Sequence, residues 1–210
     1  MTPVEQIIEH ARAASHRARH PGSDGWRHGS LHDVVLAHGR IFEPSPLPAN
    51  VYPALPGHAS KAAAILADQH AFTYVEGLAL LPDMHTVIEH AWCATFTGQV
   101  IDPSLNGNTA AAYLGVAFTM NFRRATLAAG KGAILISTPA GSPTPHPEIL
   151  MHGLTPDAIL EIGKPYEPPR TTGSRPPWPH ARVEDGPGNA TASTAPGAAS
   201  QARDRLASAA

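Results

Sequence analysis

The sequence predicts an α+β fold, in which an alanine-rich central helix packs on a mostly antiparallel sheet. The run 57–70 is rich in alanine and has helical spacing, whereas 72–81, 87–96 and 111–119 are rich in β-branched and aromatic residues. The β-type residues 99–101 follow the stretch 87–96 after only a short turn, Phe96-Thr97-Gly98, which is typical of a hairpin. Helices and paired strands that follow one another in this way favour an α+β arrangement.

The N-terminal part carries recognisable helix boundaries. Thr2-Pro3-Val4-Glu5 is a capping box with proline at the first helical position, and it predicts a helix that extends to about His20. Ser30-Leu31-His32-Asp33 begins a second, short helix that Gly39 closes. Five prolines between residues 44 and 56 then require extended chain.

The predicted central helix spans 57–70, with Ala62, Ile65 and Leu66 directed toward a core. The next strand, 72–81, is interrupted at Gly77. The remaining elements are a strand over 111–119, a helix over 121–129 stopped by Gly130, a strand over 133–137 and a final helical turn from Thr155 through Ile162.

The hairpin brings two ionisable side chains together. A three-residue loop with Gly98 at the position of positive φ places Trp92 opposite Asp102. His90 is then a diagonal neighbour of Asp102 on the same face of the sheet. A two-residue loop would place the two side chains on opposite faces. We expect Trp92 to pack against the central helix.

The single cysteine does not complete a catalytic pair in this register. Cys93 lies three residues from His90, so the two side chains point to opposite faces of a strand. We therefore interpret Cys93 as a buried structural residue. One cysteine excludes an internal disulfide and a multi-cysteine zinc site, which fits a reducing compartment.

Composition narrows the functional class. The chain has 210 residues, of which 42% are hydrophobic, and a formal charge of -2, which gives no electrostatic reason to expect nucleic acid or anionic membrane as a partner. No apolar run reaches the length of a membrane span, and the N-terminus carries Glu5 and Glu9 instead of a secretory signal. We expect a cytoplasmic protein without a cofactor, because no cofactor motif is present.

The domain organisation follows from a change in composition. Between Arg170 and Arg205 the only large apolar side chains are Trp178 and Val183, too few to offset the entropy of ordering the chain. The sequence therefore predicts one domain over 1–164, with its core at about 31–137, and a disordered tail over 165–210.

A family resemblance rests on the order of three short motifs. Tyr74-Val75-Glu76-Gly77, His90-Ala91-Trp92 and Asp102-Pro103-Ser104 follow one another in the chain, and a Tyr113 to Val116 strand comes after them. This order resembles transglutaminase-like and papain-like cysteine enzymes, and most of all small phage and mobile-element proteins of that type. The resemblance covers roughly residues 31–120. It implies His90 as a general base, Asp102 as the residue that orients it and Glu76 as a residue near the cleft.

The nucleophile of that family is missing. An ungapped count back from Tyr74 places the family's cysteine on His58 and its asparagine on Lys61, with Ala62 retained. An imidazole cannot form the thioacyl intermediate of such enzymes. We therefore expect a catalytically impaired protein that binds a protein or peptide-like ligand, in other words a pseudoenzyme with a His–Asp dyad.

Two alternatives retain chemistry at this place. In the first, Ser60 replaces the thiol in a hydrolase or acyltransferase, although two helical positions rotate it about 200° away from position 58; Ser104 is a weaker hydroxyl candidate. In the second, His58, His90 and Asp102 form a zinc site with an open position.

Overall fold

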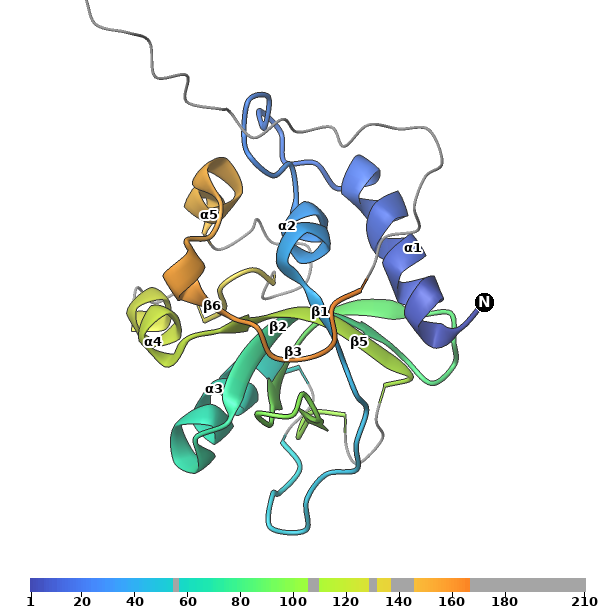
Figure 1. The fold of residues 1–210 in the computed structure, drawn as a ribbon, viewed down its shortest axis with the longest axis vertical. Helices are drawn as coiled ribbons and strands as arrows, with labels where there is room; N and C mark the ends of the chain where they lie inside the picture. Colours follow the sequence, from blue (N-terminus) through green and yellow to red (C-terminus); the bar gives the residue numbers. More distant parts are fainter. Residues whose placement is uncertain (55–56, 106–109, 129–131, 137–145, 167–210) are drawn as a thin grey trace, which may run out of the picture. The chain divides into compact units, whose positions relative to one another are not determined.

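The computed structural model describes residues 1–54, 57–105, 110–128, 132–136 and 146–166. It has the predicted α+β architecture (Figure 1). The helices are α1 (Pro3–Arg17), α2 (Leu31–His38), α3 (Ala59–His70), α4 (Met120–Ala128), α5 (Pro147–His152) and the 3₁₀ turn η1 (Pro156–Ala158). The strands are β1 (Arg40–Phe42), β2 (Thr73–Leu80), β3 (Val87–Ala94), β4 (Val100–Ile101), β5 (Ala112–Phe118) and β6 (Ile159–Leu160).

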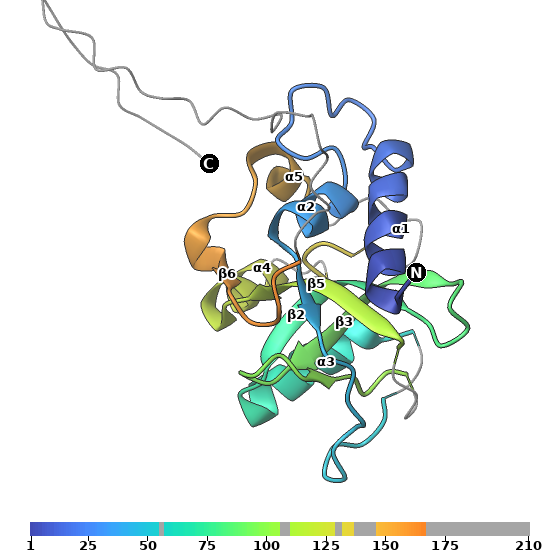
Figure 2. The same cartoon turned by 45° about the vertical axis from the view of Figure 1, so that its right-hand side comes forward.

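The first two helices begin where their capping residues predict. At the start of α1 the Thr2 hydroxyl accepts a hydrogen bond from the Glu5 amide at 3.2 Å, and the Glu5 carboxylate accepts one from the Thr2 amide at 2.7 Å. Ser30 caps α2 in a similar way, through the amide of Asp33. The two helices lie side by side in both views (Figures 1 and 2). Across the described ranges, no helix combines the length and apolar character needed to cross a membrane.

The sheet is antiparallel, with the strand order β1-β5-β2-β3-β4 and β6 paired to the end of β5. The predicted hairpin register is confirmed, because Cys93 pairs with Ile101. One position further from the turn, the same register places Trp92 opposite Asp102. Gly98 in the turn has a φ of 84°, as the three-residue loop requires.

The curled sheet is joined at its two edge strands. Glu43, directly after β1, donates its amide hydrogen to the carbonyl of Gly98 at 3.0 Å, and its carbonyl accepts one from the amide of Val100 at 2.9 Å. These bonds connect the β1 end of the strand order to β4. The sheet therefore has an inner and an outer face.

Side chains divide between the two faces by strict alternation. The inner face carries a compact aromatic and alanine cluster, and the three helices α1, α2 and α3 cover the outer face. The inner cluster consists of Phe42, Val75, Ala79, Trp92, Ala94, Val100, Ala110, Tyr113 and Ala117. The outer cluster includes Leu31, Ala63, Leu66, Tyr74, Cys93, Leu114, Val116, Phe118 and the segment 134–136.

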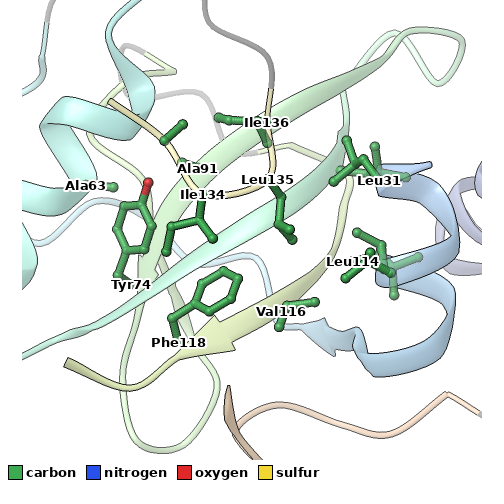
Figure 3. Close-up of a cluster of buried hydrophobic side chains, with 14 of the residues drawn as sticks. Leu31, Ala63, Tyr74, Ala91, Leu114, Val116, Phe118, Ile134, Leu135 and Ile136 are labelled. Carbon is green, nitrogen blue, oxygen red and sulfur yellow. The ribbon is translucent and has the colours of Figure 1, made fainter. Parts of the chain in front are cut away.

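The segment 133–136 is not the strand that its apolar sequence predicts. It is bent, and it crosses the outer face between Ala63 of α3 and Leu31 of α2 (Figure 3). The amides of residues 134–136 all donate to the carboxylate of Glu76 on β2 instead of to a neighbouring strand. One buried carboxylate thus replaces a ladder of sheet hydrogen bonds.

Several elements differ from the sequence prediction. β1, α5 and β6 were not predicted, and the turn from Thr155 ends at Ala158, where the chain becomes the two-residue strand β6. The beginning of the predicted tail, 165–166, belongs to the domain, because the Tyr166 hydroxyl donates to the carbonyl of Leu36. The rest of that tail and the predicted stop at Gly130 lie outside the described residues.

Candidate functional site

The structure brings His90 and Asp102 together on the inner face. His90 comes from β3 and Asp102 follows β4, and the imidazole Nε2 lies 2.7 Å from the carboxylate Oδ2. Both residues are buried, with 4% and 6% of their surfaces exposed. The pair is therefore positioned by the hairpin register and shielded from water.

Asp102 accepts hydrogen bonds from three residues. Besides His90, the Ser104 amide and hydroxyl donate to Oδ1 at 3.0 and 2.7 Å, and the Tyr113 hydroxyl donates to Oδ2 at 3.0 Å. Burial raises the pKa of Asp102, but the hydrogen bond and charge of His90 and the donors of Ser104 outweigh it and hold the pKa below its ordinary value. The carboxylate therefore stays ionised, and both of its oxygens accept hydrogen bonds.

Tyr113 is a member of this cluster that the sequence did not single out as a site residue. It comes from β5, and its hydroxyl also accepts a hydrogen bond from the Ala110 amide at 3.1 Å. Burial and the neighbouring Asp102 charge raise the pKa of Tyr113, so the phenol stays protonated and donates. The family motif that begins at Tyr113 was the available signal, but the sequence alone does not show that β5 pairs with β2, the neighbour of β3.

Trp92 lies beside His90 on the inner face, and the expected packing against the central helix was wrong. Its ring stacks 6.3 Å from that of His90 and contacts Phe42 and Tyr113 at centroid distances of 5.7 and 5.0 Å. A side chain at Gly115 would meet the Trp92 ring at 2.6 Å. The absence of a side chain at position 115 is what allows the indole to lie there.

Ser104 cannot act with His90 as the hydroxyl of a Ser-His-Asp triad. Its Oγ lies 3.2 Å from His90 Nε2, the same nitrogen that contacts Asp102. A triad requires two different ring nitrogens, one for the acid and one for the nucleophile. Ser104 therefore acts as a hydrogen-bond donor to the carboxylate of Asp102.

His58 takes no part in this cluster. It is the exposed N-cap residue of α3, and it lines a surface groove together with Ala62 and Pro103. Among the described residues, which include all three proposed ligands, no group of three or more histidine, cysteine or acidic side chains is placed to hold a metal ion. The alternative zinc site of His58, His90 and Asp102 is therefore not formed, because His58 faces the groove while the other two are enclosed.

Two further candidates lie on the outer side of the sheet. Ser60 is buried on the same side of α3 as Ala63, which packs in the outer cluster, so the structure does not bring it to His90. Glu76 also points to the outer face, where it binds Tyr74 and the 134–136 amides. Its role is structural, and the expected place near the cleft is not observed.

The predicted core side of α3 needs one correction. Leu66 is buried as expected, but Ile65 is 47% exposed and lines the same groove as His58. The buried positions of α3 are Ser60, Ala63, Leu66 and Ala67. The helix therefore presents a second apolar stripe, Ala62 and Ile65, to the groove.

Cys93 has the buried structural position predicted from parity. Its Sγ donates a hydrogen bond to the carbonyl of Ala63 on α3 at 3.1 Å, and it lies on the face opposite His90. Burial raises the pKa of the thiol to about 12. The reactive thiolate is thus negligible at neutral pH.

Comparisons with protein-family models, with curated proteins and with solved structures find no match for this chain. The inner cluster can orient an imidazole, but no thiol or triad hydroxyl stands beside it in the described part of the chain.

Proposed function

We propose that this chain is a transglutaminase-like domain without catalytic activity that binds a protein or peptide-like partner. The observation that carries the proposal is the ordered His90–Asp102 pair, together with a histidine at residue 58, the position that the family resemblance assigns to the nucleophile. The pair supports the family resemblance, and position 58 supports the loss of acyl-transfer chemistry. The proposal includes a phage or mobile-element origin, which only the sequence motifs support.

The candidate nucleophiles weigh against catalysis for separate physical reasons. Cys93 is protonated and faces away from His90, and Ser60 is buried on the outer side of the sheet. Ser104 shares the imidazole nitrogen that Asp102 already occupies. An enzyme of this class needs a nucleophile within hydrogen-bond reach of a free base nitrogen, and none of these three residues meets that condition.

The retained pair has a structural purpose that does not require turnover. Asp102 connects the end of β4 to β3 through His90 and to β5 through Tyr113. A satisfied polar cluster of this kind fixes the register of three strands and the path of the following residues, Pro103 and Ser104. Its contribution to the fold is therefore enough to account for the pair without catalysis.

Labelling of the native protein tests the proposal. We expect a fluorophosphonate probe to modify no serine, and iodoacetamide to modify Cys93 only at the rate of global unfolding. The control is the same reaction in 6 M guanidinium chloride, where Cys93 should react rapidly. Stoichiometric labelling of a native serine that disappears in His90→Gln would refute the proposal.

Restoring the thiol tests the family geometry. In a Cys93→Ala background, His58→Cys should react with iodoacetamide below pH 8.5, because the start of α3 favours a thiolate. The matched control is the same variant with His90→Gln. Since His90 is enclosed and does not line the groove, its removal should leave the pH profile of the reaction at position 58 unchanged. A profile that depends on His90 would show that the two positions act together, as in an active transglutaminase-like site, and would contradict the proposal.

A further inference from the structure

A surface groove of about 470 Å³ lies between α3, the chain segment 50–54 and Pro103. It is separate from the buried cluster, since neither His90 nor Asp102 lines it. Pro103 connects the two places, because it directly follows Asp102 in the chain and lies against the groove. A groove of this volume accommodates a few residues of peptide.

The lining of the groove is largely apolar and partly open to water. Ala54, Ala62 and Pro103 contribute to it, and two large side chains, Tyr52 and Ile65, are 86% and 47% exposed. Large apolar side chains that line a hollow and remain exposed are typical of ligand-binding surfaces. Ile65 in particular is turned away from the core that the rest of α3 buries.

The polar residues that line the groove favour a ligand with a negative charge. Lys61 and His58 line the groove at the first turn of α3, and none of the lining residues is acidic. Within the described ranges, no ion pair joins Lys61 to a carboxylate. The Lys61 cation therefore lines the groove without a carboxylate partner among the residues that the structure describes.

The start of α3 adds to this positive character. The N-cap residue His58 makes no side-chain hydrogen bond to the helix, and the first turn contains no acidic residue. The amides of residues 59–61 have no acceptor within the helix, since the first intrahelical bond runs from the Ala62 amide to the His58 carbonyl. Lys61 and these amides together suit a carboxylate.

We propose that the groove binds the C-terminal end of a peptide whose last residue is apolar. The terminal carboxylate lies at Lys61 and the first turn of α3, and the last side chain packs on Ala62 and Ile65. This inference rests on the proposed binding function and names the ligand class for it. Lys61 and Ile65 lie one helical turn apart on α3, so their side chains are neighbours. A terminal residue suits this spacing because its carboxylate and its side chain are attached to the same α-carbon.

Two peptide pools of identical random sequence test the proposal, one with free C-termini and one with C-terminal amides. Each pool is passed over the immobilised full chain, and retained peptides are sequenced by mass spectrometry. We expect at least tenfold more retention from the free-acid pool, with leucine, isoleucine, valine or phenylalanine enriched at the last position. Equal retention of both pools, retention of neither, or enrichment at internal positions only would overturn the proposal.

Variants locate the binding at the groove. Lys61→Glu should reduce retention of the free-acid pool at least tenfold, and Ile65→Ser should remove the preference for an apolar last residue. Arg17→Glu on α1 is the matched control for the charge change and should have no effect. Because Lys61 and Ile65 are exposed, both variants should keep the unfolding midpoint of the native chain. Unchanged retention in the folded Lys61→Glu protein would also overturn the assignment.

The two proposals can fail independently. Labelling of a native serine that depends on His90 would refute the catalytically inactive function while leaving peptide retention at the groove intact. Failure of the free-acid pool with an unlabelled native protein would refute only the ligand assignment.

Discussion

Two buried carboxylates on opposite faces of one sheet show how differently the same group can be used. Glu76 on the outer face accepts four hydrogen bonds, one from the Tyr74 hydroxyl and three from backbone amides. Asp102 on the inner face also accepts four, of which three come from the side chains of His90, Ser104 and Tyr113. The number of donors is equal, so it does not distinguish the two sites.

The nature of the donors distinguishes them. Burial raises the pKa of Glu76, and its hydrogen bonds from Tyr74 and the three amides only partly oppose that effect. Burial acts on Asp102 in the same direction, but the hydrogen bond and charge of His90 reverse the net shift of its pKa. A carboxylate bound to backbone amides holds one chain segment in place, whereas one bound to side chains joins the strands that carry those side chains.

The largest expected effect is on the outer face. Glu76→Gln leaves one oxygen where two accepted hydrogen bonds and turns an NH₂ group toward buried amide donors, so we expect a loss of about 4 kcal/mol in the free energy of unfolding. Urea denaturation measures it. The control is Glu161→Gln at an exposed position, with an expected change within about 0.5 kcal/mol. A loss below about 1 kcal/mol for Glu76→Gln would mean that the 134–136 segment does not depend on the carboxylate.

On the inner face, Asp102→Asn should cost about 3 kcal/mol at pH 7, because His90 and Tyr113 each lose a charged acceptor. Urea denaturation at several pH values measures the loss. If both Asp102→Asn and Tyr113→Phe leave stability unchanged, the cluster does not hold the three strands together.

The pH dependence of the two losses sharpens the contrast. The folded-state pKa of Asp102 is lowered, so its contribution to stability is present above the ordinary value of 3.8 and is lost as the pH falls through the folded-state value. The folded-state pKa of Glu76 is raised, so the protonated form contributes stability that is fully present below 4.5 and is lost as the pH rises through the folded-state value. The deficit of Asp102→Asn should therefore shrink in acid while that of Glu76→Gln grows. Parallel pH profiles for the two variants would contradict the difference.

A smaller effect tests the packing next to His90. Gly115→Ala places a methyl group 2.6 Å from the Trp92 ring and 2.8 Å from the Glu76 carbonyl, and should cost about 2 kcal/mol in thermal or urea unfolding. In a Trp92→Phe background the smaller ring should relieve part of that cost. Equal costs in both backgrounds would show that the backbone contact alone is responsible.

The smallest effect belongs to the thiol on the outer face. Cys93→Ala removes one sulfur atom and its hydrogen bond to Ala63, so we expect a loss of about 1 kcal/mol. The thiol pKa of about 12 predicts that a disulfide reagent at pH 8 reacts with the native protein no faster than it unfolds. Fast native labelling at pH 8 would mean that the outer face opens locally.

Local patterns were sufficient for much of the fold. The capping residues Thr2 and Ser30 place two helix starts, and the turn residue Gly98 sets the hairpin register that brings His90 to Asp102. Each of these features depends on residues close in the sequence. That is why α1, α2 and the β3–β4 hairpin were predicted.

Features that depend on distant residues were missed or misread. β1 is only three residues long and exists through its pairing with β5, which lies far along the chain. The bent segment 133–136 has the composition of a strand, and only the carboxylate of Glu76 accounts for its path. Short-range propensity carries no information about such partners.

The face that Trp92 shares with His90 follows from parity, but the face that α3 covers does not. Parity along β3 places Trp92 on the face of His90 and opposite Cys93, and Cys93 is the residue that contacts α3. A tryptophan beside the imidazole therefore cannot also cover that helix. The positions of Ser60 and Glu76 could not be predicted from parity, because they depend on the docking of α3 and on the 134–136 segment.

The hydrogen bonds along β1 also bear on how this chain behaves at high concentration. The outward groups of β1 are occupied, since Ile41 exchanges two bonds with Lys164 and Glu43 pairs with Gly98 and Val100. An uncovered edge strand is a template for intermolecular pairing and aggregation. Because its own backbone pairs with both sides of β1, this strand leaves no free edge to which a neighbouring molecule could add a strand.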